Sequence, residues 1–419
     1  MKKLISLIVV FSLVLLLAAC AQGPPAGGGG AGGGAGAGGG AGAGGGAGGG
    51  ADGGAGADGI DLDENDTIII GAMTFMTGAN SILGEYITPA VNLAVNEINA
   101  NGGLLGRQVE VIFADQGDDQ QTAINAHMLL FNNDQISAIV GPNGSANTIA
   151  VIETLRDFEI LYMANGSSPN IMLEGIPHVF QIRMTDDLGG AIMARAMVEQ
   201  FGIERPAIMY MNDTFGEALA FAVRDYFYEQ YGFEPAAFIN FDPVGERNFA
   251  PFFTQILASD ADGLLAIGGQ LQGAVIMQQA YNVQFPYPMF CNSSLMSADV
   301  IEQAGVAANG WMSVADWSTE LQTPTARHFI DSFYAETGKL PNVFGTYAWD
   351  AIHVIFEAIR VAGTANRQPI IDAMTSLNQF PAAMSTMTWR ENHSLADSML
   401  FVVVEDGIPV VHDFIPRPE

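Results

Sequence analysis

From residue 67 onward, short apolar runs rich in β-branched residues alternate with longer segments whose apolar residues recur at helical spacing. The first series predicts strands at residues 67–73, 109–114, 136–140 and 160–163, and helices at 85–99, 120–131 and 149–158. The second series predicts strands at residues 206–211, 236–241 and 263–267, and helices at 215–231, 249–257 and 272–281. Such alternation is typical of α/β folds in which helices cover both faces of a parallel sheet. Two series predict two α/β lobes.

The length and charge of the region after residue 60 agree with two domains and exclude one class of partner. At about 150 residues per domain, residues 61–419 suffice for two. They carry 43 acidic and 13 basic side chains, and the whole chain has a formal net charge of −30. A surface of this sign repels phosphates, so we expect no nucleic-acid binding.

The first 20 residues have the features of a bacterial secretion signal. Met1-Lys2-Lys3 is positively charged, residues 4–17 are apolar apart from two serines, and Leu17-Ala18-Ala19-Cys20 places small residues before a cysteine. The pattern predicts a signal peptide over residues 1–19, because its apolar stretch is too short for a stable membrane span. Cys20 resembles the lipobox cysteine that is acylated after cleavage. We therefore expect an extracytoplasmic protein anchored to the bacterial membrane by lipid on Cys20, the alternative being an uncleaved anchor.

Residues 20–60 are predicted to be the lipidated cysteine and a disordered tether. Residues 21–60 hold 23 of the 50 glycines, and most of the others are alanines. Such a segment cannot bury enough apolar surface to offset the entropy of ordering it. The remaining cysteine, Cys291, is expected to be a small buried hydrophobic residue, and with Cys20 acylated no internal disulfide can form.

Two loops of small polar residues follow neighbouring predicted strands. Residues 141–147 read Gly-Pro-Asn-Gly-Ser-Ala-Asn, and residues 164–169 read Ala-Asn-Gly-Ser-Ser-Pro. Ligands of open α/β sheets bind beyond the carboxyl ends of the strands, so both loops are predicted to face one cleft. Ser145 could contact an anion there, or Ser145 or Asn147 could simply cap the next helix; sequence alone weighs these interpretations evenly. The second loop could also be an ordinary turn.

Motifs of catalysis and metal binding are missing from the sequence. The six histidines lack metal-ligand spacing, and the two cysteines form no zinc cluster. The sequence contains no G-x-S-x-G, no S-x-x-K and no P-loop. The many carboxylates are expected to form a solvated acidic surface. We therefore expect no enzymatic activity, no metal and no cofactor.

Several segments, in this order, resemble the substrate-binding proteins of branched-chain amino-acid ABC transporters, the leucine/isoleucine/valine type of periplasmic binding protein. The segments are residues 94–107, 109–115, 139–145, 212–217, 347–350 and 387–392. The run Asn101-Gly102-Gly103-Leu104-Leu105-Gly106-Arg107 is the most specific of them. The resemblance covers about residues 65–415 without large insertions.

The resemblance implies an α/β, two-lobed type I periplasmic-binding-protein fold, in which each lobe is a mainly parallel sheet flanked by helices. The chain would cross the hinge three times, and we place the crossings near Thr185, Val314 and Thr386. The predicted lobes are residues 61–185 with 315–386, and residues 186–314 with 387–419. A ligand that contacts both lobes would favour their closed arrangement.

The resemblance also implies ligand contacts. A serine in the position of Ser145 holds the ligand carboxylate, and the loop with Gly166 and Ser168 binds the head group. Phe215 and Gln270 stand where aromatic residues of the second lobe close over the ligand. The full predicted set is Leu83, Asn143, Ser145, Gly166, Ser168, Phe215, Gln270 and Ser293.

The predicted set has one departure from the family pattern. Ser293 stands where amino-acid binders have a glutamate for the ligand's ammonium group. A buried ammonium without a carboxylate would be destabilised, so a branched-chain amino acid requires a substitute carboxylate. Asp213, Glu217 and Asp299 are the candidates. We expect a small amino acid or a related carboxylate or amide ligand.

The expected function is therefore that of the solute-binding component of an ABC importer. Its expected partners are the permease and ATPase subunits and the membrane, and the protein is expected to be a monomer. A ligand sensor that signals to a membrane receptor is the main alternative. An extracytoplasmic enzyme would instead require a carboxylate pair in the cleft, and a purely structural lipoprotein would have no cleft.

Overall fold

The computed structural model describes residues 61–395 and 399–416. The predicted signal peptide, Cys20 and the tether lie outside the described residues. The strands are β1 Thr67–Thr74, β2 Gln108–Asp115, β3 Ile136–Val140, β4 Leu161–Ala164, β5 Val179–Gln181, β6 Pro206–Met211, β7 Ala237–Phe241, β8 Gly263–Ile267, β9 Met289–Cys291, β10 Trp311–Ala315, β11 Phe380–Pro381, β12 Thr386–Met387, β13 Met399–Glu405 and β14 Ile408–Ile415.

Helices connect most of these strands. The α-helices are α1 Ser81–Ala100, α2 Gln120–Phe131, α3 Ser145–Ile149, α4 Asp186–Phe201, α5 Thr214–Tyr226, α6 Ala250–Leu257, α7 Gln270–Asn282, α8 Ala298–Ala304, α9 Pro324–Thr337, α10 Val343–Ala362 and α11 Arg367–Ser376. The shorter helical turns are η1 Leu62–Glu64, η2 Thr154–Asp157, η3 Pro169–Met172, η4 Phe227–Tyr231, η5 Ser293–Met296 and η6 Gly305–Ala308. No helix in the described part of the chain is long and apolar enough to cross a membrane.

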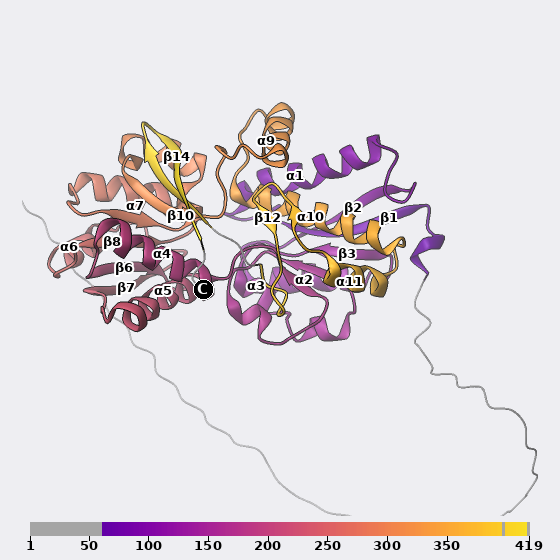
Figure 1. The fold of residues 1–419 in the computed structure, drawn as a ribbon, viewed down its shortest axis with the longest axis horizontal. Helices are drawn as coiled ribbons and strands as arrows, with labels where there is room; N and C mark the ends of the chain where they lie inside the picture. Colours follow the sequence, from indigo (N-terminus) through magenta and orange to yellow (C-terminus); the bar gives the residue numbers. More distant parts are fainter. Residues whose placement is uncertain (1–60, 396–398, 417–419) are drawn as a thin grey trace, which may run out of the picture. The chain divides into compact units, whose positions relative to one another are not determined.

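The strands form two large sheets, as the two series of strand and helix signals predict (Figure 1). The first has the order β2-β1-β3-β4-β5, and all its strand pairs are parallel. The second has the order β14-β13-β10-β9-β8-β6-β7; the pairs β14–β13 and β13–β10 are antiparallel, and the other pairs are parallel. The predicted α/β class with mainly parallel sheets is confirmed.

The central strands of each sheet are covered on both faces, and β3, β8 and β10 are buried along their whole length. In β1, Ile68 and Ile70 belong to the core that includes α1 and α10, whereas Met73 belongs to the core on the α2 side. In β6, Met209 and Ile208 divide in the same way between two cores. Successive side chains of a strand point to opposite faces, so unbroken apolar runs indicate burial on both sides.

The helix predicted at residues 149–158 is wrong in its extent. The structure begins α3 earlier, at Ser145, and ends it at Ile149, and a turn and η2 follow. The last residues of the predicted loop, Ser145-Ala146-Asn147, therefore belong to α3. Helical periodicity therefore placed the apolar residues correctly but did not locate the break.

The most specific motif of the sequence has a structural role. Leu104 and Arg107 exchange backbone hydrogen bonds of 2.8 and 3.0 Å, closing the turn between α1 and β2. A Cβ on Gly103 would lie 2.0 Å from the Arg107 carbonyl oxygen, so this position requires glycine. The Arg107 guanidinium donates to the carbonyls of Leu62 and Thr67 at 2.7 and 3.1 Å. The motif thus fastens the start of β1 and lies apart from the ligand loops.

The predicted lobe boundaries stay a prediction, although local contacts bear on the third crossing. Beyond Thr386 the chain remains beside β5: the Gln181 amide donates to the His393 carbonyl at 3.0 Å, and Leu395 forms a bridge with Met184. Arg390 also donates to the Thr185 hydroxyl at 2.7 Å. We therefore expect the third crossing to follow Leu395.

A buried carboxylate on α10 fixes the segment before β12. Asp350 accepts backbone hydrogen bonds from Ala383 and Met384 at 2.7 and 3.0 Å. Burial raises the pKa of Asp350 from 3.8 to about 7, although both hydrogen bonds act to lower it. Between these two pH values the folded chain holds a proton that the unfolded chain has released. The free energy of unfolding must therefore fall as the pH rises through this window.

Replacing Asp350 by Asn should reduce this pH dependence. The free energy of unfolding of the wild type, measured with urea at pH 5, 6 and 7, is expected to decrease with rising pH more steeply than that of Asp350→Asn. Asp331→Asn, at an exposed position of α9, is the control and should retain the wild-type slope. Equal slopes for wild type and Asp350→Asn would contradict this account.

Candidate functional site

The carboxyl ends of parallel strands from both sheets meet around one cavity of about 280 Å³. From the first sheet it receives the loops after β1, β2, β3, β4 and β5, and from the second the loops after β6, β8 and β9. The lining residues are Phe75, Asn80, Leu83, Gly117, Asp118, Asn143, Gly144, Ser145, Ala146, Asn147, Gly166, Ser167, Arg183, Met211, Asp213, Phe215, Gly268, Gly269, Gln270, Ser294 and Phe344. We call it the cleft cavity.

Six of the eight ligand contacts expected from sequence line the cleft cavity. They are Leu83, Asn143, Ser145, Gly166, Phe215 and Gln270. They come from α1, from the loops after β3 and β4, and from the beginnings of α5 and α7. The structure therefore brings together residues separated by up to 187 positions in the sequence, because parallel strands present their carboxyl ends at the same edge.

The hydroxyl of Ser145 joins the two small-residue loops. Its oxygen accepts hydrogen bonds from the backbone amides of Ser167 and Ser168 at 3.2 and 3.0 Å. Ser145 is the first residue of α3 and makes no side-chain cap. The hydroxyl oxygen is thus occupied by the neighbouring loop, and its proton is left to donate.

The approach of these loops depends on Gly166. A Cβ at this position would lie 2.8 Å from the Ser145 Cα and 2.6 Å from the Ile171 side chain. The loops cannot keep their present separation with a larger residue here. Gln181 holds the same loop from the other side, since its side-chain amide donates to the carbonyls of Gly166 and Ser168 at 2.7 and 3.2 Å.

The structure places the other two expected residues, Ser168 and Ser293, outside the lining of the cleft cavity. Ser168 is fully buried, and its hydroxyl accepts from the Asn170 amide at 3.3 Å. This hydrogen bond is the one expected if the loop is an ordinary turn. Ser293 begins η5 and faces a second cavity instead, while its neighbour Ser294 lines the cleft cavity. The roles that the resemblance implied for Ser168 and Ser293 remain predictions.

Two side-chain amides in the cleft cavity are buried without partners. The side-chain nitrogen and oxygen atoms of Asn143 and Gln270 make no hydrogen bond within the described residues. Backbone atoms of Asn143 are satisfied separately, by the side chain of Gln116 at 2.9 and 3.1 Å. Buried amides without partners are costly, so these two are available to a ligand. Asn143 follows β3 and Gln270 begins α7, so the two sheets contribute one amide each.

A buried cation lies beside this part of the cavity. The Nε atom of Arg183 lies 3.9 Å from a carboxylate oxygen of Asp316, and its guanidinium carbon lies 4.9 Å from the Tyr347 ring centroid. The Tyr347 hydroxyl donates to Asp316. Burial lowers the pKa of Arg183, but Tyr347, Asp316 and Asp186 more than offset this and raise it. Burial in turn raises the pKa of Asp186 to about 7, against the effect of Arg183.

Of the three candidate carboxylates for an ammonium group, the structure brings one, Asp213, into the cleft cavity. One oxygen of Asp213 caps α5 by accepting from the Gly216 amide at 2.7 Å, and burial raises the pKa of its carboxyl group. Asp299 accepts the Tyr86 hydroxyl at 2.6 and 2.7 Å and lines neither this cavity nor its edge. Glu217 is likewise absent from the described lining.

Apolar side chains complete the lining. Phe75, Leu83, Met211, Phe215 and Phe344 contribute to it. Apolar walls with a few placed polar groups are typical of small-molecule sites, in which the walls hold the body of the ligand and the polar groups orient its head. Within the described residues, no group of three His, Cys, Asp or Glu could hold a metal ion.

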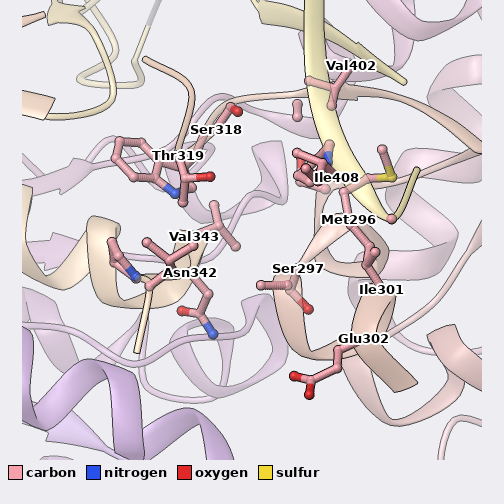
Figure 2. Close-up of a pocket in the computed structure, with 18 residues that line it drawn as sticks. Met296, Ser297, Ile301, Glu302, Ser318, Thr319, Asn342, Val343, Val402 and Ile408 are labelled. Carbon is pink, nitrogen blue, oxygen red and sulfur yellow. The ribbon is translucent and has the colours of Figure 1, made fainter. Parts of the chain in front are cut away.

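A second cavity is larger, about 360 Å³, but contains none of the loops after the strands of the first sheet (Figure 2). It lies among η5, α8, the start of α10 and the β13–β14 turn. We assign the candidate site to the cleft cavity because the strand ends, the two free amides and the charged groups all meet there.

Sequence reasoning missed Arg183 as a cleft residue. The strand that positions it, β5, has three residues and was not predicted. Val179-Phe180-Gln181 is too short to show the periodicity of a strand, so the sequence gives no signal that Arg183 lies two residues beyond a strand end.

Two α/β units with their strand ends around a shared cavity define a binding protein of the two-lobed periplasmic type. The chain belongs to the periplasmic binding protein family, whose sequence profile matches residues 67–408.

Characterised relatives resemble most of this chain at low identity. The leucine-, isoleucine-, valine-, threonine- and alanine-binding protein of Pseudomonas aeruginosa is 23% identical over 332 residues, which are 79% of this chain and 87% of that protein. The Leu/Ile/Val-binding protein BraC3 of Rhizobium johnstonii is 23% identical over 338 residues, 78% of this chain and 89% of that protein.

Solved structures share the fold. A leucine-binding protein from Thermotoga maritima has a TM-score of 0.76 at 21% identity, covering 83% of this chain and 99% of its own. The isoleucine complex of a branched-chain amino-acid transporter substrate-binding protein from Streptococcus pneumoniae has a TM-score of 0.75 at 22% identity, covering 84% and 100%. A benzoate complex of a solute-binding protein from R. palustris has a TM-score of 0.77 at 19% identity, covering 84% and 97%. The predicted type I periplasmic-binding-protein fold is confirmed.

Gly166→Ala should destabilise the protein by about 1–3 kcal/mol, because the added methyl group overpacks the contact between the two loops. Gly269→Ala is the matched control in the same cavity: its Cβ would meet a single atom, the Gln272 side-chain oxygen at 3.1 Å, and no backbone atom. Urea unfolding should separate the two variants clearly. Equal stability of Gly166→Ala and wild type would show that the loops are not tightly joined.

Proposed function

We propose that this protein is the extracytoplasmic solute-binding component of an ABC importer and that it binds a small amino acid or a related carboxylate or amide in the cleft cavity. The observation that carries the proposal is the pair of buried amides without partners in the described structure, Asn143 and Gln270. A ligand that satisfies both contacts elements of both sheets at once. Such a ligand favours the closed arrangement of the lobes, the form a permease would recognise.

The charged groups support a zwitterionic ligand. Arg183 and the free hydroxyl proton of Ser145 offer donors to a carboxylate, and Asp213 offers a carboxylate to an ammonium group. The pKa of Asp213 is raised by burial, and a bound ammonium group would act in the opposite direction. The names of the relatives, which are binders of leucine, isoleucine, valine, threonine and alanine, agree with this ligand class. We propose no chemical reaction on the ligand.

Replacing Asp213 by Asn should weaken binding of leucine selectively. Asparagine caps helices as well as aspartate does, so the variant removes the charge while retaining the α5 cap. A charge-assisted hydrogen bond contributes about 1.5–3 kcal/mol, which predicts at least about a tenfold loss of leucine affinity. The affinity for 4-methylpentanoate, which lacks the ammonium group, should change little.

Titration calorimetry on the purified protein measures both affinities. An equal loss for the two ligands would remove Asp213 from the proposed role. If no amino acid, short carboxylate or amide binds to the wild type, the importer proposal itself fails.

The anchoring of the protein is a second part of the proposal. We propose that residues 1–19 are cleaved, that Cys20 carries lipid and that the Gly/Ala segment tethers a monomeric binding unit near its permease and ATPase partners. The support is the sequence pattern at residues 1–60. A lipid-bearing cysteine keeps the protein at the outer side of the membrane.

Cys20→Ser should move the protein from the membrane fraction to the soluble extracytoplasmic fraction and abolish incorporation of labelled fatty acid. Cys291→Ala is the control, because Cys291 is fully buried in β9 and unavailable to a lipid transferase. Labelling of Cys20→Ser at the wild-type level would contradict the lipid anchor.

A further inference from the structure

The second cavity contains polar groups whose arrangement the fold itself does not explain. Ser297 and Asn342 line it, and their exposed fractions are 7% and 4%. The Ser297 hydroxyl and the Asn342 side-chain nitrogen have no hydrogen-bond partner within the described residues, and neither has the indole nitrogen of Trp317, which also lines the cavity. By contrast, the neighbouring Ser318 hydroxyl accepts from the Glu320 amide at 3.1 Å. Burial of unpartnered polar groups costs about 1–3 kcal/mol each, so a bound partner would stabilise them.

The local structure accounts for the unpartnered atoms of Asn342 and Ser297. The Asn342 side-chain oxygen caps α10, accepting from Phe344 and Gly345 at 3.1 and 3.0 Å, which directs the nitrogen away from the helix. Ser297 precedes α8 without capping it through its side chain. Figure 2 shows Asn342 and Val343 on one side of the open space, and Ser297 and Ile301 on the other.

The walls around these groups are apolar. Met296, Ile301, Val343 and Val402 are at least nine-tenths buried and line the cavity, and Leu340 and Ile408 form an exposed apolar rim. A volume of about 360 Å³ suits a small molecule rather than a peptide. The body of the occupant must therefore be apolar and compact.

The charge of the cavity selects against ions. None of the described lining residues is Lys or Arg, so an anion would lack a counter-charge, while Glu302 at the edge and the net charge of −30 repel it. The Asn342 nitrogen can only donate, and a cation also brings donors, so it would leave this amide unsatisfied. A neutral molecule with an acceptor oxygen satisfies the amide and the serine hydroxyl together.

We propose that the second cavity is a separate binding site for an uncharged, compact apolar molecule with a carbonyl oxygen, which the Asn342 amide and the Ser297 hydroxyl bind by donating to that oxygen. Ser297 lies between η5 and α8, beside the second sheet, and Asn342 is the N-cap of α10, which packs on α1 beside the first sheet. An occupant therefore contacts elements associated with both sheets, at a place apart from the cleft cavity. The site does not depend on the importer proposal.

Cyclohexanone is the probe for this site, because it has an apolar ring and a single acceptor oxygen. Ligand-observed NMR titration of the purified protein should show saturable binding of cyclohexanone, and at least about tenfold weaker binding of cyclohexanecarboxylate and cyclohexylammonium. Equal affinities for the three compounds, or no saturable binding of cyclohexanone, would overturn the proposal.

Two variants test the named groups. Asn342→Asp keeps the α10 cap but replaces the donor by a carboxylate, and should weaken cyclohexanone binding at least about tenfold. Ser297→Ala removes a hydroxyl with no partner in the described structure, so thermal stability should be unchanged while the affinity falls about threefold or more. If Asn342→Asp does not fold, the cyclohexanone affinity of Ser297→Ala alone tests the proposal.

Gln270→Ala is the control for binding in the cleft cavity, and it should leave the cyclohexanone affinity at the wild-type value. A loss of binding in Gln270→Ala with none in Ser297→Ala would place the probe in the cleft cavity and refute the second site. The leucine affinity of Ser297→Ala, measured in parallel, should equal that of the wild type. A failure of the second site is thereby distinguished from a failure of the importer proposal.

Discussion

The parallel direction of the strands is the constraint on which the site depends. Parallel strands end at one edge of a sheet, so the loops after β1, β3 and β4 must lie side by side, and the same holds for those after β6, β8 and β9. Ser145 then joins two of these loops by accepting the amides of Ser167 and Ser168. The glycine at 166 permits this contact because a Cβ would lie 2.8 Å from the Ser145 backbone. The position of the two loops at the candidate site follows from these few interactions.

The two cavities differ in the chemistry of their unsatisfied groups. The cleft cavity combines whole side-chain amides, which both donate and accept, with a cation and a carboxylate. The second cavity offers two nitrogen donors, of Asn342 and Trp317, and the Ser297 hydroxyl within apolar walls, and no cation among its described lining residues. The first set complements a ligand of both charges, and the second complements a neutral carbonyl compound. Burial strengthens the selectivity of both cavities for their ligands, because an unpaired polar group is most costly where water is excluded.

Part of the candidate site was predictable because its residues follow strands with clear apolar runs. Ser145 and Gly166 were found in this way, and Phe215 and Gln270 by family resemblance. The role expected of Ser168 stays a prediction, because its hydroxyl accepts from the Asn170 amide in a turn and the residue does not line the cleft cavity. Arg183 was missed because β5 is too short to give a periodic signal. The helix break after α3 was missed for a related reason, since apolar spacing continues across it.

The sequence alone determined the α/β class, the two series of elements and most of the loops that carry the site. Hydrophobic periodicity is local, and it is readable wherever an element is long enough to repeat. Only the tertiary structure decided which polar atoms remain free. No local pattern shows that side-chain atoms of Asn143, Gln270, Ser297 and Asn342 lack hydrogen-bond partners, because such partners would come from neighbours that folding brings from distant positions. Whether a polar side chain caps a helix, closes a turn or remains available to a ligand therefore depends on hydrogen-bond partners that only the tertiary structure supplies.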